Sequence, residues 1–456
     1  MTKAEKKSRI KTMNIFEYSV FVLVKISLQY ILKSYQKGEI TLSIFKPFSA
    51  LRPAPEYAKN VAALPYDVMN SEEAREAVKG NPYSFLHVDK AEIDLSEETF
   101  IYSDEVYEKA AENLKKLETE KICITDSEPC FYIYRQIMNG REQTGLVGCA
   151  SVDDYIGKRI KKHELTRADK EADRIRHVDT CDANTGPIFL CYKDNTDVNT
   201  IIDNIKRTEK PVYDFISDDG ISHTVWIISE KDVICKLSAL LKDSGDFYIA
   251  DGHHRCASAV KVAQKRREQC PAYDGSEEFN FFLAVLFPVS CLSIMDYNRV
   301  VKDLNGLSQN EFITVIKEKF EVEEYNGEGQ FKPEQKHTFG MYLSGRWYKL
   351  TSKDGTFDAA DPVERLDVSI LQKNLLEPIL GIGDPRTDKR IDFIGGIRGL
   401  KELEKRVGED MTVAFSMYPT TLEDLMDIAD AGKIMPPKST WFEPKLMSGL
   451  FIHKLQ

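Results

Sequence analysis

Residues 246–257 have the sequence DFYIADGHHRCA, and the rest of the chain is interpreted outward from this segment. The apolar run 247–250 predicts a short strand, the pair Asp251 and Gly252 predicts a turn, and residues 256–267 predict a helix. A strand that passes directly into a helix leaves free backbone N–H groups and the positive end of the helix dipole at the turn. The segment therefore predicts a local fold together with a place that favours an anion.

The side chains at this turn suit a phosphate group. Gly252 lets an anion approach the backbone closely, and Arg255 offers a planar pair of donors for phosphate oxygens. His253 and His254 titrate near neutral pH. The alternative is a plain helix start, with Asp251 as the N-cap and both histidines solvated. Four polar groups at one turn favour the binding site over the cap.

Strands and helices follow one another in mixed order on both sides of this segment. Asn139 and Gly140 predict a hairpin turn between two strands. The mixture has no strict strand–helix–strand rhythm, so we predict an α+β fold. The predicted strands are 42–48, 85–88, 130–137, 144–152, 188–192, 212–216, 223–228, 279–289, 338–343, 347–350 and 413–417. After the first of them, the segment Arg52-Pro-Ala-Pro55 is expected to break the strand. The predicted helices start at Asn70 and cover 97–120, 198–206, 231–242, 369–381 and 422–431.

Length and composition restrict the class of protein. A chain of 456 residues predicts two or three domains, or one domain with large insertions. Hydrophobic residues make up 42% and charged residues 30%, which is typical of a globular protein. The net charge of −11 argues against a non-specific nucleic-acid coat, which needs a basic face. We expect an atypical extension over residues 1–40, followed by regions at 41–300 and 301–456.

The N-terminus and the cysteines bear on location. A basic start precedes an apolar stretch that Glu17 and Lys25 interrupt, so it is too short for the roughly 18 residues of a spanning helix. We expect this extension to carry no catalytic residues and not to bind a membrane.

The nine cysteines are scattered without a C-x-x-C pair, which predicts free thiols in a reducing cytoplasm rather than a zinc ribbon.

Three further segments carry polar residues that favour chemistry. His163 and Glu164 form a candidate base with its orienting partner, or a pair of metal ligands, although a solvated charged turn is the alternative. Asp67 follows Pro-Tyr and is a candidate Mg²⁺ ligand, although a structural turn is the more frequent outcome. The loop 435–445 is either a binding loop or a rigid tail. It offers the phosphate donors Lys438, Ser439 and Thr440.

Taken together, these segments resemble the prokaryotic domain-of-unknown-function 1015 family, whose members are described as ParB-like or SpoOJ-like. The resemblance covers residues 44–453. The Asp-Gly-His-His-Arg turn also resembles the phosphate-binding turn of the ParB/sulfiredoxin superfamily, some members of which are kinases of free serine. The matching pieces are Phe45-Lys-Pro-Phe, Pro65-Tyr-Asp-Val, Asn81-Pro82, Lys162-His-Glu, Asp173-Arg174, Ala250-Asp-Gly-His-His-Arg and Pro436-Pro-Lys-Ser-Thr.

The resemblance implies a fold and a function. The fold is a ParB/sulfiredoxin-like core elaborated by additional mixed-sheet and helical segments. The function is phosphoryl transfer from ATP or ADP, with Mg²⁺, to a small molecule such as L-serine. Gly252, Arg255 and Lys438 would hold phosphates, and Asp251 or a neighbouring histidine would assist the transfer, with Asp251 also a metal candidate. Glu164 and Asp67 are the two candidates for the base.

Two other functions remain open on the sequence. One is a nucleotide-dependent DNA-binding or regulatory protein, against which stand the acidic charge and the absence of a convincing helix-turn-helix. The other is a metal-dependent hydrolase built on His163, Glu164, His253 and His254. It requires these four residues to converge on one ion.

Overall fold

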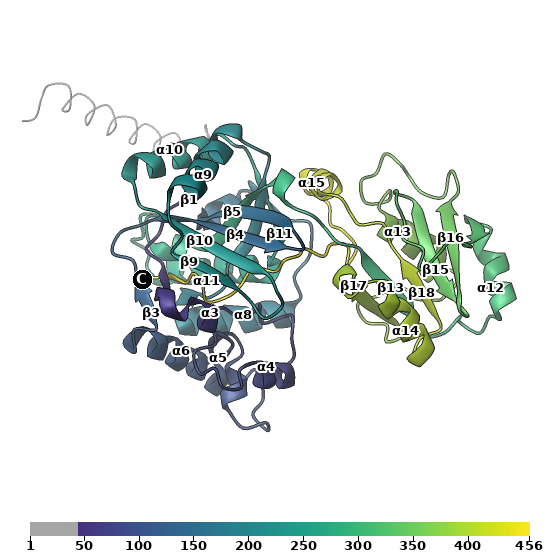
Figure 1. Cartoon of the computed structure of the whole chain (residues 1–456), viewed down its shortest axis with the longest axis horizontal. Coiled ribbons are helices and arrows are strands. Elements are labelled where there is room, and N and C mark those ends of the chain that lie inside the picture. The colour runs from purple at the N-terminus through teal and green to yellow at the C-terminus, as the bar shows by residue number, and fades with distance from the viewer. Residues whose placement is uncertain (1–43) are drawn as a thin grey trace, which may run out of the picture. The chain divides into compact units, whose positions relative to one another are not determined.

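The computed structural model describes residues 44–456, whose two large sheets and their helices are taken together below as one unit. The expectations for residues 1–40 lie outside the described residues. The unit mixes antiparallel and parallel strand pairs with helices, so the prediction of an α+β fold is confirmed (Figure 1). None of the helices in this described part is both long and apolar enough to cross a membrane.

A large mixed sheet forms the first half of the unit. Most neighbouring strands are antiparallel, while β12 pairs with β8 and β11 pairs with β6 in parallel. In sheet order the strands are β6 Ile160–Lys161, β11 Phe247–Asp251, β8 Ile188–Tyr192, β12 Phe281–Pro288, β5 Arg141–Ser151, β4 Phe131–Met138, β10 Ser222–Ile228 and β9 Tyr213–Ile216, and β1 Phe45–Lys46 pairs with β5.

Alternating side chains of the central strands bury both faces of this sheet. In β4, Tyr132 and Tyr134 belong to one apolar cluster, while Phe131 and Ile133 belong to a second. Helices α9 Thr196–Thr208, α10 Lys231–Lys242 and α11 His253–Gln269 cover the second face with their apolar sides. Each fully buried large apolar side chain contributes about 1.5–3 kcal/mol, so both faces hold β11 and α11 in place.

A helical layer contains the short strand pair β2 Leu51–Pro53 and β3 Cys123–Thr125. Its longest helix, α6, packs against α8, which in turn packs against α11. This chain of contacts places α8 beside the start of α11. The helices before α9 are α3 Ala58–Val61, α4 Ser71–Ala77, α5 Leu86–Asp89, α6 Asp104–Thr119, α7 Val152–Ile156 and α8 Ala168–Cys181.

A second, antiparallel sheet belongs to the C-terminal third of the chain. Its order is β14 Phe320–Glu324, β16 Arg346–Ser352, β15 Thr338–Leu343, β18 Val413–Ser416, β13 Tyr297–Val301 and β17 Ile391–Gly395. The helical elements of this region are α12 Gln309–Ile316, α13 Asp367–Leu371, the π-helical turn Gln372–Leu376, α14 Lys401–Glu409 and α15 Leu422–Asp430.

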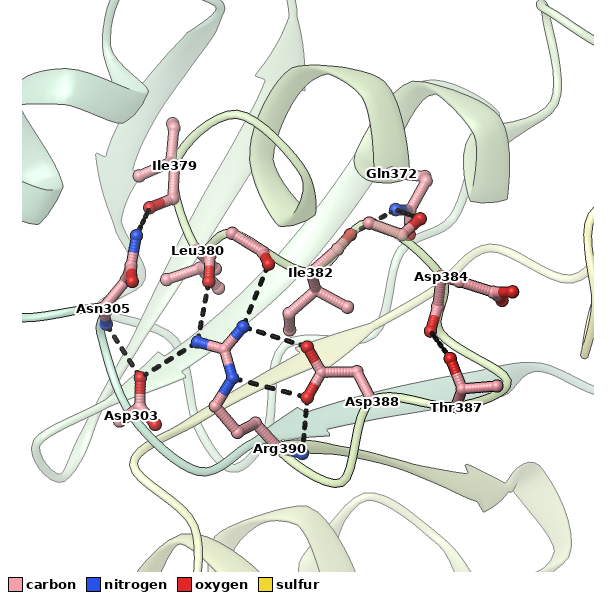
Figure 2. A network of polar contacts seen from close by, with 12 residues as sticks. Asp303, Asn305, Gln372, Ile379, Leu380, Ile382, Asp384, Thr387, Asp388 and Arg390 are labelled. Carbon is pink, nitrogen blue, oxygen red and sulfur yellow. Dashed lines mark hydrogen bonds and ion pairs between the residues drawn. The ribbon is translucent and has the colours of Figure 1, made fainter.

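Arg390 anchors the loop before β17 (Figure 2). Its guanidinium donates to the backbone oxygens of Leu380 and Gly381, each at 3.0 Å, and to both carboxylate oxygens of Asp388. It also lies 3.5 Å from Oδ1 of Asp303. One arginine therefore connects the turn that follows the π-helical segment to the edge of the second sheet.

The last residues of the chain return to the first half of the unit. Phe442 bridges to Ile294, Ser448 to Ala63 and Ile452 to Leu51. The final strand, β19 His453–Lys454, pairs with β7 Ala183–Asn184. This return brings the loop 435–445 next to the end of β11.

Many predicted elements are confirmed. The two-residue turn at Asn139 and Gly140, both with positive φ, joins β4 to β5 as predicted. Asn70 and Glu73 form a reciprocal capping box at the start of α4. Helix α10 has the predicted bounds, and all nine cysteines are free, six of them buried.

Other predictions were wrong. The segment 85–88 is not a strand, because Phe85 caps the short helix α5; a four-residue apolar run cannot distinguish a buried strand from a buried helical turn. Arg52 and Pro53 do not break a strand but belong to β2. The predicted helix 97–120 begins later, at Asp104, and the predicted helix 369–381 splits into α13 and a π-helical turn. Helix α8 was missed, because its buried face includes the charged residues Asp173 and Arg174.

Candidate active-site cavity

A cavity of about 680 Å³ opens where β11 ends and α11 begins. The segments that line it come from distant parts of the sequence, including residues 64–68, 163–164, 250–255 and 435–445. All the candidate residues therefore lie around one space, although their roles stay predictions. They are Asp67, His163, Glu164, Asp251, Gly252, His253, His254, Arg255, Lys438, Ser439 and Thr440.

The turn between β11 and α11 has a left-handed backbone at Gly252, with φ of +89°. A Cβ at this position would lie 3.6 Å from Cα of Ile188, which is an ordinary contact, so the backbone angle is what requires glycine. The N-cap is Gly252 and not Asp251, and within residues 44–456 no side chain caps the helix. The first-turn N–H groups of α11 are consequently available to a ligand.

Asp251 lies at the end of β11 and faces Lys445. Its Oδ1 accepts a hydrogen bond from the backbone N–H of Gly252 at 2.8 Å, and its Oδ2 accepts one from Nζ of Lys445 at 2.9 Å. Burial by itself raises the pKa of Asp251, but Lys445, Arg255 and the Gly252 N–H outweigh it and hold that pKa well below its usual range. Asp251 is therefore ionised at neutral pH.

Arg255 lies in the first turn of α11, and only one of its two terminal nitrogens makes a short hydrogen bond to the protein. Its Nη1 donates to the carbonyl of Pro187 at 2.7 Å, while its Nη2 lies 4.0 Å from Oδ1 of Asp67. Its guanidinium also lies 5.9 Å from the ring of Tyr66, and that of Arg174 lies 4.1 Å from the same ring. The Asp67 contact is long enough for an anion to compete with it.

His163, Glu164 and His253 lie together on the cavity wall. His163 and Glu164 belong to the loop between β6 and α8, and His253 is the first residue of α11. Each residue offers one possible metal-ligand atom, and these three atoms lie within 4.8 Å of one another. Oε2 of Glu164 lies 3.7 Å from Nδ1 of His253. Three of the four residues that the hydrolase hypothesis requires therefore converge, while His254 is not a member of the group.

Burial sets the protonation of the imidazoles. It lowers the pKa of His163 to about 4, against the opposing effects of Asp251 and the Ile249 carbonyl. It also lowers the pKa of His253 well below the usual value, with a further lowering by His163, and it lowers the pKa of His254. All three histidines are therefore neutral at pH 7. By contrast, burial and the charge of Asp251 raise the pKa of Glu164.

The loop 435–445 forms another part of the cavity wall. The backbone N–H of Met435 donates to the carbonyl of His163 at 2.8 Å, and the carbonyl of Lys438 accepts from Nη2 of Arg299 at 2.9 Å. Lys438 has a left-handed backbone with φ of +58°, and its Nζ lies 5.5 Å from the ring of Tyr297. These contacts hold the loop and leave the ammonium group of Lys438 exposed.

Ser439, a predicted phosphate donor, has its hydroxyl bound within the loop, and its role toward phosphate stays a prediction. Its side chain is buried, and its hydroxyl donates to the carbonyl of Pro436 at 2.6 Å. Its own carbonyl accepts a hydrogen bond from Thr420. The hydroxyl of Ser439 therefore shapes the loop in this structure.

Sequence reasoning missed three contributors. Lys445 pairs with Asp251, and Tyr66 contacts two arginines. Glu443 accepts from Nε1 of Trp441 at 3.0 Å and from the backbone N–H of Lys445 at 3.1 Å, and burial raises its pKa. The signal for Lys445 was a single basic residue in the segment 441–450, and its partner is visible only in three dimensions.

One comparison with known proteins identifies a family for this chain. The model of the family described as "Protein of unknown function (DUF1015)" matches residues 45–369, well over half of the chain. No curated protein matches the chain.

Several solved structures show a distant likeness. A mutant of a free serine kinase in complex with AMP aligns with a TM-score of 0.34 and 15% identity. The alignment covers 68% of this chain and 87% of the kinase chain. A conserved hypothetical protein from Pyrococcus furiosus aligns with a TM-score of 0.32 and 15% identity, over 66% and 93%. SbnI from Staphylococcus aureus, truncated at its C-terminus, aligns with a TM-score of 0.34 and 10% identity, over 66% and 85%.

Proposed function

The chain belongs to the family described as protein of unknown function (DUF1015), and we propose that it is a nucleotide-dependent phosphotransferase. The donor is ATP or ADP, and the acceptor is a small hydroxylated metabolite such as free L-serine. A volume of about 680 Å³ lies within the range of roughly 300–1,000 Å³ that ligand pockets usually have.

The observation that carries the proposal is the uncapped start of α11 with Gly252 in its left-handed conformation. Arg255, Lys438 and Lys445 line the same cavity around it. Backbone N–H groups at a helix start and flexible or forked cations are the donors that phosphate oxygens prefer. We assign the terminal phosphates of the nucleotide to this turn.

The carboxylate of Asp251 suits Mg²⁺, which prefers oxygen ligands and keeps several of its waters. The ionised state of Asp251 fits this role, and its Oδ2 would have to be shared between the ion and Lys445. When bound, Mg²⁺ neutralises charge on the phosphates. Lys445 holds the carboxylate in place for that ligand.

We assign the base to Asp67. Its carboxylate is half exposed and lies 4.0 Å from Nη2 of Arg255, and therefore beside the phosphate that this arginine would hold. In the transfer, the acceptor oxygen forms a bond to the terminal phosphorus while the bond from that phosphorus to the bridging oxygen breaks. Asp67 takes the proton of the acceptor hydroxyl, and the shortened nucleotide leaves.

The test begins with nucleotide binding. Thermal shift and calorimetry with ATP, ADP, CTP and GTP, each with Mg²⁺, should show saturable binding of an adenine nucleotide. Phosphorus NMR with L-serine among a panel of small alcohols should then show a phosphate monoester. Asp67→Asn should abolish the product and retain nucleotide binding. Asp219→Asn, at another carboxylate of the cavity wall, should retain both. If no nucleotide shifts the melting temperature, the proposal fails.

A further inference from the structure

Two buried histidines of the cavity wall lack the partners that buried polar groups normally have. His163 is 2% exposed and His253 is 6% exposed. Neither ring nitrogen of His163, nor Nε2 of His253, has a hydrogen-bond partner. The large majority of buried side-chain polar atoms do have one, and a buried polar atom without a partner destabilises the folded chain. The two rings lie against each other, with centroids 4.5 Å apart, so their unpartnered nitrogens indicate that a ligand belongs there.

We propose that His163, Glu164 and His253 bind one divalent transition-metal ion through a ring nitrogen of each histidine and one carboxylate oxygen. This site is separate from the magnesium position proposed at Asp251. It also does not depend on the phosphotransferase proposal, because none of its three residues has a role there.

The donor atoms determine the class of metal. Imidazole nitrogen suits zinc, cobalt, iron and nickel, whereas magnesium and calcium take oxygen ligands. No cysteine belongs to the group found among the described residues, so soft thiolate ligation does not apply. Three protein ligands leave further coordination positions open, and these would face the cavity, as in catalytic rather than structural metal sites.

The distances allow the site to close on an ion. Ligand atoms that each lie about 2.0–2.2 Å from one ion are roughly 3–3.5 Å from one another. The present atoms lie within 4.8 Å of one another, with 3.7 Å between Glu164 Oε2 and His253 Nδ1. The side chain of Glu164 is 48% exposed, so it can rotate to bring the group together.

The local charge also permits a cation. The start of α11 contributes roughly half a positive charge, which opposes an ion near His253. A carboxylate carries a full negative charge, so Glu164 outweighs the helix end, and its Oε2 lies 3.7 Å from Nδ1 of His253. An imidazole binds a metal through a ring lone pair, and three ring nitrogens of these two histidines have no hydrogen-bond partner.

The experiment uses the full chain after removal of metals with a chelator. Titration with Co²⁺, followed by its visible absorption, should show one equivalent bound in a site with nitrogen and oxygen ligands. Zn²⁺ should displace Co²⁺, and millimolar Mg²⁺ should not. His163→Gln, His253→Gln and Glu164→Gln should each weaken Co²⁺ binding at least about 100-fold, since even outer-shell partners change metal affinity 10–100-fold.

His87→Gln is the matched control, because His87 also faces a carboxylate, Asp94 at 2.8 Å, but does not line this cavity. Its Co²⁺ affinity should be unchanged. If His163→Gln fails to fold, the other two variants and an X-ray absorption count of imidazole ligands in the unmodified chain decide the question. Three results overturn the proposal: no stoichiometric Co²⁺, unchanged affinity in the folded ligand variants, or a thiolate band that assigns the ion to the exposed Cys235 or Cys270.

Discussion

Lys445 donates a hydrogen bond from Nζ to Oδ2 of Asp251 at 2.9 Å, although 194 residues separate them in the sequence. Asp251 ends β11, and Lys445 lies in the segment that returns from the second sheet. Burial lowers the pKa of Lys445, but Asp251 reverses this and raises it above the usual value. Both groups are charged at neutral pH, and each stabilises the charge of the other.

Lys445→Met keeps the side chain's length and removes its charge. Asp251 then loses its main positive partner, so its pKa should rise. We expect the free energy of unfolding at pH 7, measured with urea, to fall by about 1–3 kcal/mol. Because the pKa of Asp251 is depressed in the folded chain, its contribution is complete above about pH 4 and is lost as the pH falls further. The difference between variant and wild type should therefore shrink in acid.

Lys438→Met is the control for this pair, since Lys438 lines the same cavity and has no carboxylate partner among residues 44–456. Its unfolding free energy should stay within about 0.5 kcal/mol of wild type. An equal loss in both variants, or a Lys445→Met loss that does not change with pH, would contradict the pairing.

Arg255→Lys keeps the charge and loses the planar fork. Lysine cannot hold the Pro187 carbonyl and a phosphate with two coplanar donors. We expect nucleotide affinity to weaken by about 1–3 kcal/mol with little change in stability. Arg267→Lys, near the other end of α11, should leave affinity unchanged. Unchanged affinity in Arg255→Lys would remove this residue from the site.

Gly252→Ala tests the left-handed turn. An alanine at φ of +89° costs about 1–2 kcal/mol of stability, and no clash adds to this. Gly345→Ala is matched, with φ of +80° in the hairpin between β15 and β16 and open space around it. We expect both variants to lose similar stability, and only Gly252→Ala to lose nucleotide affinity. Equal affinities in calorimetry would show that phosphates do not use this turn.

Asp367 offers a pH test away from the cavity. Burial raises the pKa of its carboxyl to about 7, the Asp424 charge adds to this, and the His337 N–H and Lys336 oppose it. The pKa of Asp367 is higher in the folded chain than in the unfolded chain. Its contribution to the free energy of unfolding is therefore complete below about pH 4. This contribution is lost as the pH rises to about 7, by at most about 4 kcal/mol.

Asp367→Asn removes this titration. We expect the variant's stability to fall less than that of wild type between pH 4 and pH 8, with the variant more stable at pH 8. Urea midpoints across this range measure the effect. The exposed Asp354→Asn should follow wild type. Parallel pH profiles of Asp367→Asn and wild type would count against a raised pKa.

The sequence by itself determined the local elements whose signals are local. Asn139-Gly140 specified its hairpin turn, because both residues adopt positive φ easily. Asn70 and Glu73 specified a helix start, because the capping box lies within four residues. Residues 247–255 indicated the strand, turn and helix of the cavity. The composition indicated a globular protein, and the mixed order of strands and helices indicated the α+β class. The sequence wrongly predicted a strand at Phe85, where the apolar pattern is short, and predicted no helix at α8, whose buried face is partly charged. In both places the burial of the side chains depends on residues that are distant in the sequence.

Only the tertiary structure decided which residues meet in the cavity. The return of residues 433–456 to the first sheet brings Lys445 to Asp251 and the loop 435–445 to His163, and nothing local encodes these pairings. Packing also decided the state of the side chains. Burial leaves the imidazoles of His163 and His253 neutral, and both nitrogens of His163 and Nε2 of His253 have no hydrogen-bond partner. The hydroxyl of Ser439 is bound within its own loop. Desolvation and long-range contacts are properties of the folded chain, which is why a linear pattern could name these residues but not their surroundings.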